Sequence, residues 1–225
     1  MILAVTGGKG GVGKSTVAYN LAAHLDGVVV DGDLGMADLP TARGPDLHDV
    51  LAGRATALEA VREETPVSIL PCGRSLAGAR AVDPTALVTA VEAVERVYGT
   101  VVVDSPAGMR ADAGLPLYVA DACVLVTTPA ETALGDAVRV RALARELDAG
   151  LVRVVLNRVD SDPDCESVAE LLGAPVIPIP DIGVIARAQA SGQPVCRHTP
   201  DSDACRPFER LASTVRQECR HSRSS

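Results

Sequence analysis

The segment from Gly8 to Ser15 contains the residue types that together bind phosphate. It reads Gly8, Lys9, Gly10, Gly11, Val12, Gly13, Lys14 and Ser15. This run satisfies the pattern GxxxxGK[ST], and it follows a short apolar run and precedes an Ala/Leu-rich segment, as a P-loop requires. The glycines let backbone N–H groups turn inward on phosphates, and the positive end of the following helix faces the same anion. The sequence therefore predicts a P-loop.

Three side chains at the end of this segment can hold a nucleoside triphosphate and its metal. Lys14 is predicted to reach the β- and γ-phosphates. The Ser15 hydroxyl is predicted to bind Mg²⁺, which neutralises charge between those phosphates during transfer. Thr16 is predicted to contact the α-phosphate. ATP and Mg²⁺ are therefore the expected cofactors.

A dinucleotide fingerprint overlaps the same glycines. Gly8, Gly10 and Gly13 fit GxGxxG, and Asp31 ends the next apolar run at a suitable distance. That fingerprint explains neither the Lys14-Ser15 pair nor Lys9, whereas the P-loop pattern accounts for every position it specifies. The P-loop interpretation is therefore preferred.

Carboxylates follow two other apolar runs. Asp104 ends Val101–Asp104 and is predicted to serve the magnesium site, although an Asp at a strand end also caps turns. Asp31 and Asp33 follow the run that begins at Val28, and one of them is expected to orient water near the γ-phosphate. Alternation along an extended chain sends both to the same side, so spacing does not choose between them.

Lysine usage also draws attention to the P-loop. Of 21 cationic residues only Lys9 and Lys14 are lysine, and arginine is used everywhere else. Lysine presents a compact ammonium where arginine presents a broad planar fork, so a site that keeps lysine against this bias is expected to need its shape.

Apolar β-branched runs alternate with Ala/Leu/Arg/Glu-rich segments, which is typical of βαβ units and a sheet buried on both faces. The expected fold is α/β, a doubly wound, mainly parallel seven-stranded sheet flanked by helices. Strands are predicted at Ile2–Thr6, Val28–Asp31, Val67–Pro71, Thr100–Asp104, Cys123–Thr127, Val152–Asn157 and Val176–Ile179. Helices are predicted at Lys14–Leu25, Leu47–Leu51, Ala57–Glu63, Pro84–Tyr98, Thr132–Leu147, Glu166–Leu172, Val184–Ser191 and Cys205–Cys219.

Gly- and Pro-containing loops connect some of these elements. They are predicted at Gly32–Pro45, Cys72–Asp83 and Ser105–Leu115, where such a fold carries its functional residues. Residues 1–225 are expected to form one domain with a C-terminal helix and tail at about 204–225. The apolar spacing in that tail favours a helix docked on the core over one lying on a membrane.

Composition excludes several classes of function. The chain has 225 residues, 47% hydrophobic, no Trp and a net charge of -8, which argues against wrapping nucleic acid or stacking on its bases. Six Cys without a CxxC pair, and no secretory signal, indicate a reduced, cytoplasmic protein. No apolar run is long enough to span a bilayer, and peripheral membrane contact is disfavoured without being excluded.

The stretches KGGVGKST, VVVDGDLGMADL and VVVDSPAGM together resemble the deviant-P-loop MinD/ParA ATPases, and the likeness continues through NRV and IPDIGVIARAQASGQPV. It covers most of residues 1–200. The resemblance implies that Lys9 reaches across an ATP-sandwiched homodimer to the partner's phosphates. It further implies roles for the remaining positions: Asp33 on the attacking water, Asp31 and Asp104 at the magnesium site, Gly108 in a switch loop, and Asn157 and Pro180 at the adenine.

The same resemblance implies a slow ATPase that dimerises with ATP under the control of an unidentified activating protein, in positioning division, partition or surface machinery. Three alternatives remain open. One is a non-hydrolysing, nucleotide-dependent scaffold. Another is a metal-cluster carrier, although the Cys spacing gives it little support. The third is GTP as the nucleotide, because Asn157–Asp160 imitates NKxD.

Overall fold

A seven-stranded parallel sheet forms the centre of the computed structural model, which describes residues 1–34, 39, 44–63, 65–73, 83, 85–108, 111–160 and 162–222. The strands are β1 (Ile2–Thr6), β2 (Val28–Asp31), β3 (Ile69–Leu70), β4 (Val101–Asp104), β5 (Ala122–Thr127), β6 (Gly150–Val159) and β7 (Val176–Pro180). Their order is β3-β2-β4-β1-β5-β6-β7, and every neighbouring pair is parallel. The predicted doubly wound α/β fold is therefore confirmed.

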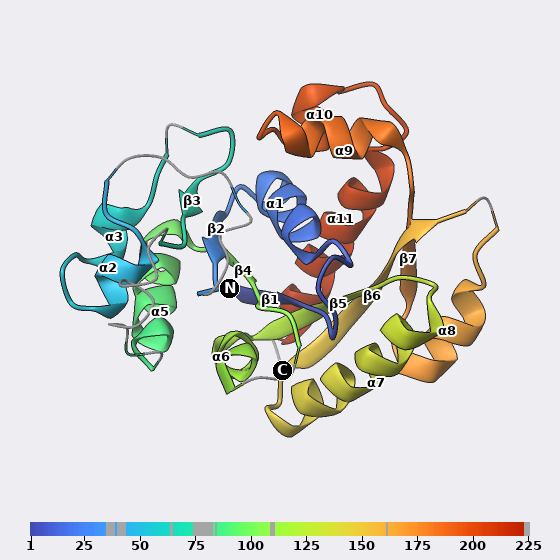
Figure 1. The fold of residues 1–225 in the computed structure, drawn as a ribbon, viewed down its shortest axis with the longest axis horizontal. Helices are drawn as coiled ribbons and strands as arrows, with labels where there is room; N and C mark the ends of the chain where they lie inside the picture. The colour runs from blue at the N-terminus through green and yellow to red at the C-terminus, as the bar shows by residue number, and fades with distance from the viewer. Residues whose placement is uncertain are drawn as a thin grey trace.

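Helices cover both faces of the sheet (Figure 1). One layer is built from α1 (Lys14–Leu25) and α11 (Arg206–Ser222), beside α9 (Gly183–Ala190) and α10 (Val195–His198). The opposite layer contains α5 (Ala86–Tyr98), α6 (Ala111–Val119), α7 (Glu131–Glu146) and α8 (Cys165–Leu172). The short helices α2 (Leu47–Leu51) and α3 (Ala57–Ala60) lie at the β3 end.

The side chains of β1 show how the core is divided by the sheet. Leu3 and Val5 pack with the apolar side chains of α1 and α11, whereas Ile2 and Ala4 belong to clusters on the other face. This is the two-residue alternation of a strand, applied to a strand that is buried on both sides. β1 is thus packed on both faces immediately before the P-loop.

The C-terminal helix docks on the core, as its spacing predicted. Phe208, Leu211, Ala212 and Val215 of α11 are buried and pack with α1. Among the helices in the described ranges, none combines the length and apolar composition that crossing a bilayer requires.

Two helices within the described ranges were not predicted. The loop expected at Ser105–Leu115 gives way to α6 from residue 111, even though α6 contains Pro116. Leu117 explains this difference, because it is buried against the opposite-face core and that packing outweighs the local propensity. The other missed helix, α10, is a single turn that begins after Pro194.

Candidate functional site

The predicted P-loop connects the carboxyl end of β1 to the first turn of α1. The strand ends at Thr6 and the helix begins at Lys14, with Gly13 immediately before it at φ 100°. The helical hydrogen-bond ladder starts where the Val17 N–H donates to the Gly13 carbonyl at 3.0 Å. The N–H groups of Lys14 to Thr16 precede that ladder, so they lie at the positive end of α1 and suit an anion.

Close packing around the loop explains two of its glycines. A Cβ on Gly8 would lie 2.5 Å from Asp136 of α7, and one on Gly13 would lie 2.2 Å from the Asn157 amide nitrogen. Nothing lies within 4 Å of a Cβ placed on Gly11, which faces open space. The loop is therefore closely packed at Gly8 and Gly13 and open at Gly11, and this open side is where a phosphate chain fits.

Gly13→Ala should destabilise the nucleotide-free protein. The new Cβ would displace Asn157, whose amide donates to the Val12 carbonyl at 2.7 Å, and alanine is strained at a positive φ. We expect a loss of about 2–3 kcal/mol in the free energy of unfolding, measured by urea titration. Gly10→Ala is the control, because its Cβ would come no nearer than 3.9 Å to Ala107. Equal destabilisation by both substitutions would contradict this explanation.

The two lysines of the loop point to different places. Lys14 is 7% exposed, and its Nζ lies 3.5 Å from the Lys9 carbonyl oxygen, so its ammonium lies over the loop. Lys9 is exposed, and its Nζ donates to Thr132 Oγ1 at 3.2 Å at the start of α7. Lys14 is thus placed to bind a phosphate in its own cradle, and Lys9 stands at the surface beside it.

Two carboxylates meet beside the cradle. Asp31 and Asp104 are direct register partners at the carboxyl ends of β2 and β4, and Asp104 is also opposite Val5 of β1. Both are buried, at 0% and 1% exposure. Side-chain oxygens of Asp and Ser are the ligand types that Mg²⁺ prefers, and Ser15 is at the neighbouring helix start. The donor set fits the magnesium ion that the sequence predicted.

Asp33 lies beyond the end of β2. Its backbone N–H donates to Asp31 Oδ1 at 3.4 Å, and the Leu34 N–H donates to the Gly32 carbonyl at 3.1 Å, so the chain turns here. Strand alternation therefore does not extend to Asp33. Asp33 is half-buried whereas Asp31 is fully buried, so the two carboxylates have different access to water.

A cavity of about 190 Å³ lies at the start of α1, and its lining includes both residues predicted for the adenine site, Asn157 and Pro180. Asn157 is 8% exposed, and its amide nitrogen donates to the P-loop carbonyl of Val12. The side chain thus braces the loop as well as lining the cavity. The amide oxygen and the second N–H of Asn157 remain available to a base bound here.

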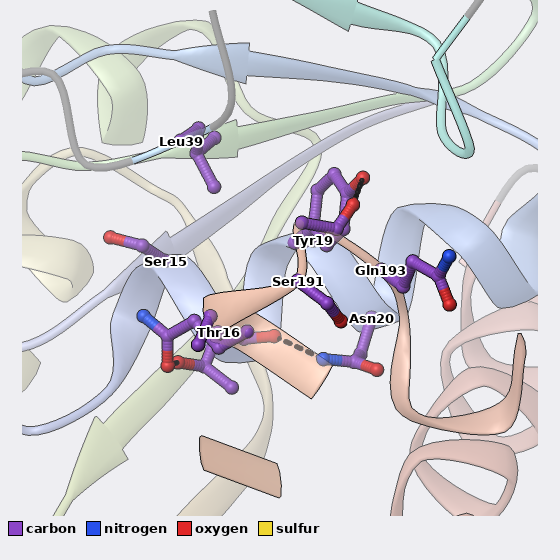
Figure 2. Close-up of a pocket in the computed structure, with 10 residues that line it drawn as sticks. Ser15, Thr16, Tyr19, Asn20, Leu39, Ser191 and Gln193 are labelled. Carbon is purple, nitrogen blue, oxygen red and sulfur yellow. Dashed lines mark hydrogen bonds between the residues drawn. The ribbon is translucent and has the colours of Figure 1, made fainter. Parts of the chain in front are cut away.

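A second cavity, of about 420 Å³, continues along α1 (Figure 2). Thr16, Tyr19 and Asn20 lie on one face of the helix, and the segment from Gln189 to Gln193 faces them. Thr16 Oγ1 donates to Gln189 Oε1 at 2.8 Å, and Tyr19 OH donates to the Gly192 carbonyl at 2.8 Å. Thr16 and Gln189 line both cavities, so the two cavities are adjacent.

Gln189 is a site residue that sequence reasoning missed. Its bond to Thr16 means that the Thr16 hydroxyl, predicted to contact the α-phosphate, already has a protein partner. A phosphate contact at Thr16 therefore uses its N–H group or exchanges this bond. No local pattern marks Gln189, because its role depends on how α9 folds over α1.

The predicted switch loop follows β4. Gly108 has φ 89°, with nothing within 4 Å of a Cβ built on it, and Ala107 lies beside Gly10 of the P-loop.

The six cysteines are all free thiols. Among the residues that the structure describes, no group of three or more His, Cys, Asp or Glu side chains is arranged to hold a metal ion.

Comparisons with known proteins agree with this geometry. Residues 3–195 match the model of the CobQ/CobB/MinD/ParA nucleotide binding domain. An uncharacterized ATP-binding protein of Methanocaldococcus jannaschii is 31% identical over 96% of this chain and 88% of its own.

Two solved structures share the fold closely. The cell division ATPase MinD of Pyrococcus furiosus is 29% identical, with a TM-score of 0.89 over 96% of this chain and 98% of its own. The septum site-determining protein MinD of Pyrococcus horikoshii OT3, complexed with Mg-ADP, is 29% identical, with a TM-score of 0.88 over 95% of each chain.

Proposed function

The chain belongs to the CobQ/CobB/MinD/ParA nucleotide-binding family, and from that membership we propose that it is a MinD/ParA-like ATPase whose dimerisation is controlled by ATP. ATP and Mg²⁺ are its cofactors. The biological task is the positioning of division, partition or surface machinery in the cytoplasm, under an activating protein partner.

In this proposal each part of the site has one task. The α1 N-terminus and Lys14 bind the β- and γ-phosphates, and Ser15, Asp31 and Asp104 hold the metal. Mg²⁺ supplies positive charge that offsets the charge developing between those phosphates. Asp33 orients the attacking water from the edge of the site, where its partial exposure admits water.

The separate directions of the two lysines carry the dimer proposal. A P-loop needs one lysine on its own phosphates, and Lys14 is buried at that position. Lys9 is exposed, and among the residues that the structure describes its ammonium bonds one neutral hydroxyl, that of Thr132, at 3.2 Å. A bond between this ammonium and a phosphate has charge on both partners, so it is stronger than the bond to the neutral Thr132 hydroxyl. The ammonium is therefore available to a phosphate group presented by a second copy of the chain.

Removing the Lys9 ammonium should therefore abolish the ATP-dependent dimer and spare the monomer's nucleotide site. We expect wild type to be a dimer with Mg-ATP and a monomer with ADP, by size-exclusion chromatography with light scattering. Lys9→Ala should remain a monomer in both, and its affinity for a fluorescent ATP analogue should stay within about threefold of wild type. Asp33→Ala, which slows turnover, should preserve the ATP-bound dimer during the run.

The possible results separate this proposal from its alternatives. A wild-type monomer in every nucleotide would remove the dimer switch and leave the phosphate site in place. An ATP-dependent dimer without measurable turnover would instead favour the non-hydrolysing scaffold. Stronger competition by GTP than by ATP for the analogue would overturn the choice of base.

A further inference from the structure

The loop that carries Asp33 is bonded by two buried side chains outside the phosphate-binding motifs. Cys72 Sγ lies 3.1 Å from the Asp33 carbonyl oxygen, and His48 Nε2 lies 3.0 Å from the Leu34 carbonyl oxygen. Cys72 follows β3 and His48 belongs to α2, so two separate elements hold consecutive carbonyls of one turn. Both side chains are buried, at 1% and 3% exposure.

The chemistry of these bonds fixes the direction of donation. A carbonyl oxygen only accepts, so the Cys72 thiol donates to Asp33 and the His48 Nε2–H donates to Leu34. Burial, and next the charge of Asp31, raise the pKa of the Cys72 thiol to about 12, which keeps its proton in place at neutral pH. Sγ and Nε2 are 3.6 Å apart, so the two donors form one contiguous contact with the turn.

The surroundings of His48 lock its ring in place. The Leu47 N–H donates to the Pro71 carbonyl at 2.9 Å, which ties the start of α2 to the end of β3. A Cβ on Gly73 would lie 1.9 Å from His48 Nδ1, so only glycine permits the chain to pass this close to the imidazole. α2 is in turn fixed by a capping box between Asp46 and Asp49.

We propose that His48 and Cys72 are positioning residues for ATP hydrolysis, which hold the Asp33 turn by its backbone so that the carboxylate stays aimed at the attacking water. This inference rests on the proposed role of Asp33. It assigns a task to a histidine and a cysteine that are not among the residues proposed to hold the nucleotide or the metal, and it predicts that turnover depends on them more than binding does.

Paired substitutions test this proposal. Cys72→Ser and His48→Gln keep a hydrogen-bond donor, whereas Cys72→Ala and His48→Leu remove it. We expect each removal to lower kcat for Mg-ATP on the order of tenfold with KM within about twofold, because misplacing a catalytic group costs turnover more than affinity. The donor-keeping variants should recover most of the lost kcat. Cys123→Ala is the control, because that thiol is equally buried but contacts the Ala149 carbonyl instead of the Asp33 turn.

A readout without nucleotide keeps the inference separate from the function proposed for Asp33. Amide hydrogen exchange at Asp33 and Leu34 should be at least about tenfold faster in Cys72→Ala and His48→Leu than in wild type or Cys123→Ala. Unchanged exchange, or kcat values that simply follow the unfolding temperature across all variants, would overturn the inference. If Asp33→Asn leaves kcat unchanged, the role of Asp33 fails, whereas the exchange rates still decide whether His48 and Cys72 hold the turn.

Discussion

Lys14→Ala is expected to weaken Mg-ATP binding by at least about 100-fold, because it removes two charge-assisted bonds of about 1.5–3 kcal/mol each. The ammonium is buried over the loop, and within the described part of the chain its hydrogen bond is a long one, 3.5 Å, to the Lys9 carbonyl. The Lys14 ammonium is therefore available to bind phosphate. Isothermal titration calorimetry with a non-hydrolysable ATP analogue and Mg²⁺ measures the change.

Two further variants show whether the effect belongs to this position. Lys14→Arg should bind the analogue nearly as poorly, because a planar guanidinium is too broad for the buried position over the loop that the Lys14 side chain occupies. Lys9→Ala removes the same kind of charge five residues earlier and should bind the analogue almost normally. Binding at wild-type strength by Lys14→Ala would mean that the nucleotide does not use this cradle.

The parts of the fold that were predictable are those set by local pattern. The apolar runs located all seven strands, and the bounds of β1, β2, α1 and α2 were predicted to the residue. Glycine spacing and the run into α1 were sufficient to locate the cradle, because a P-loop is one contiguous segment. Tertiary packing was not predictable in the same way, and α6 forms because Leu117 is buried.

The contacts that could not be predicted from the sequence join side chains to segments that are not their sequence neighbours. Asn157 bonds Val12 across 145 residues and Gln189 bonds Thr16 across 173, whereas His48 bonds Leu34 across 14. The resemblance to MinD/ParA ATPases implied a place for Asn157 at the base, but not its bond to the loop. A histidine in a short helix has no pattern of its own, and its role became visible only with its partners.

Asp33→Asn is expected to lower kcat for Mg-ATP hydrolysis on the order of 100-fold or more, with affinity for the nucleotide within a few-fold of wild type. Asparagine has the same shape but neither the charge nor the basicity to orient and deprotonate water. Phosphate release under saturating Mg-ATP measures kcat, and a binding titration measures affinity. Asp203→Asn is the control, because Asp203 is an exposed ion-pair partner of Arg206 on the C-terminal segment.

Comparison with Asp31→Asn completes the assignment, because sequence spacing left the two carboxylates equivalent. Asp31 is fully buried and opposite Asp104, so its loss should raise the Mg²⁺ concentration needed for half-maximal activity. Asp33→Asn should leave that concentration unchanged, since Asp33 is proposed to act on water rather than on the metal. A shifted magnesium requirement in Asp33→Asn, with normal kcat at high Mg²⁺, would exchange the two roles and make Asp31 the residue that faces the water.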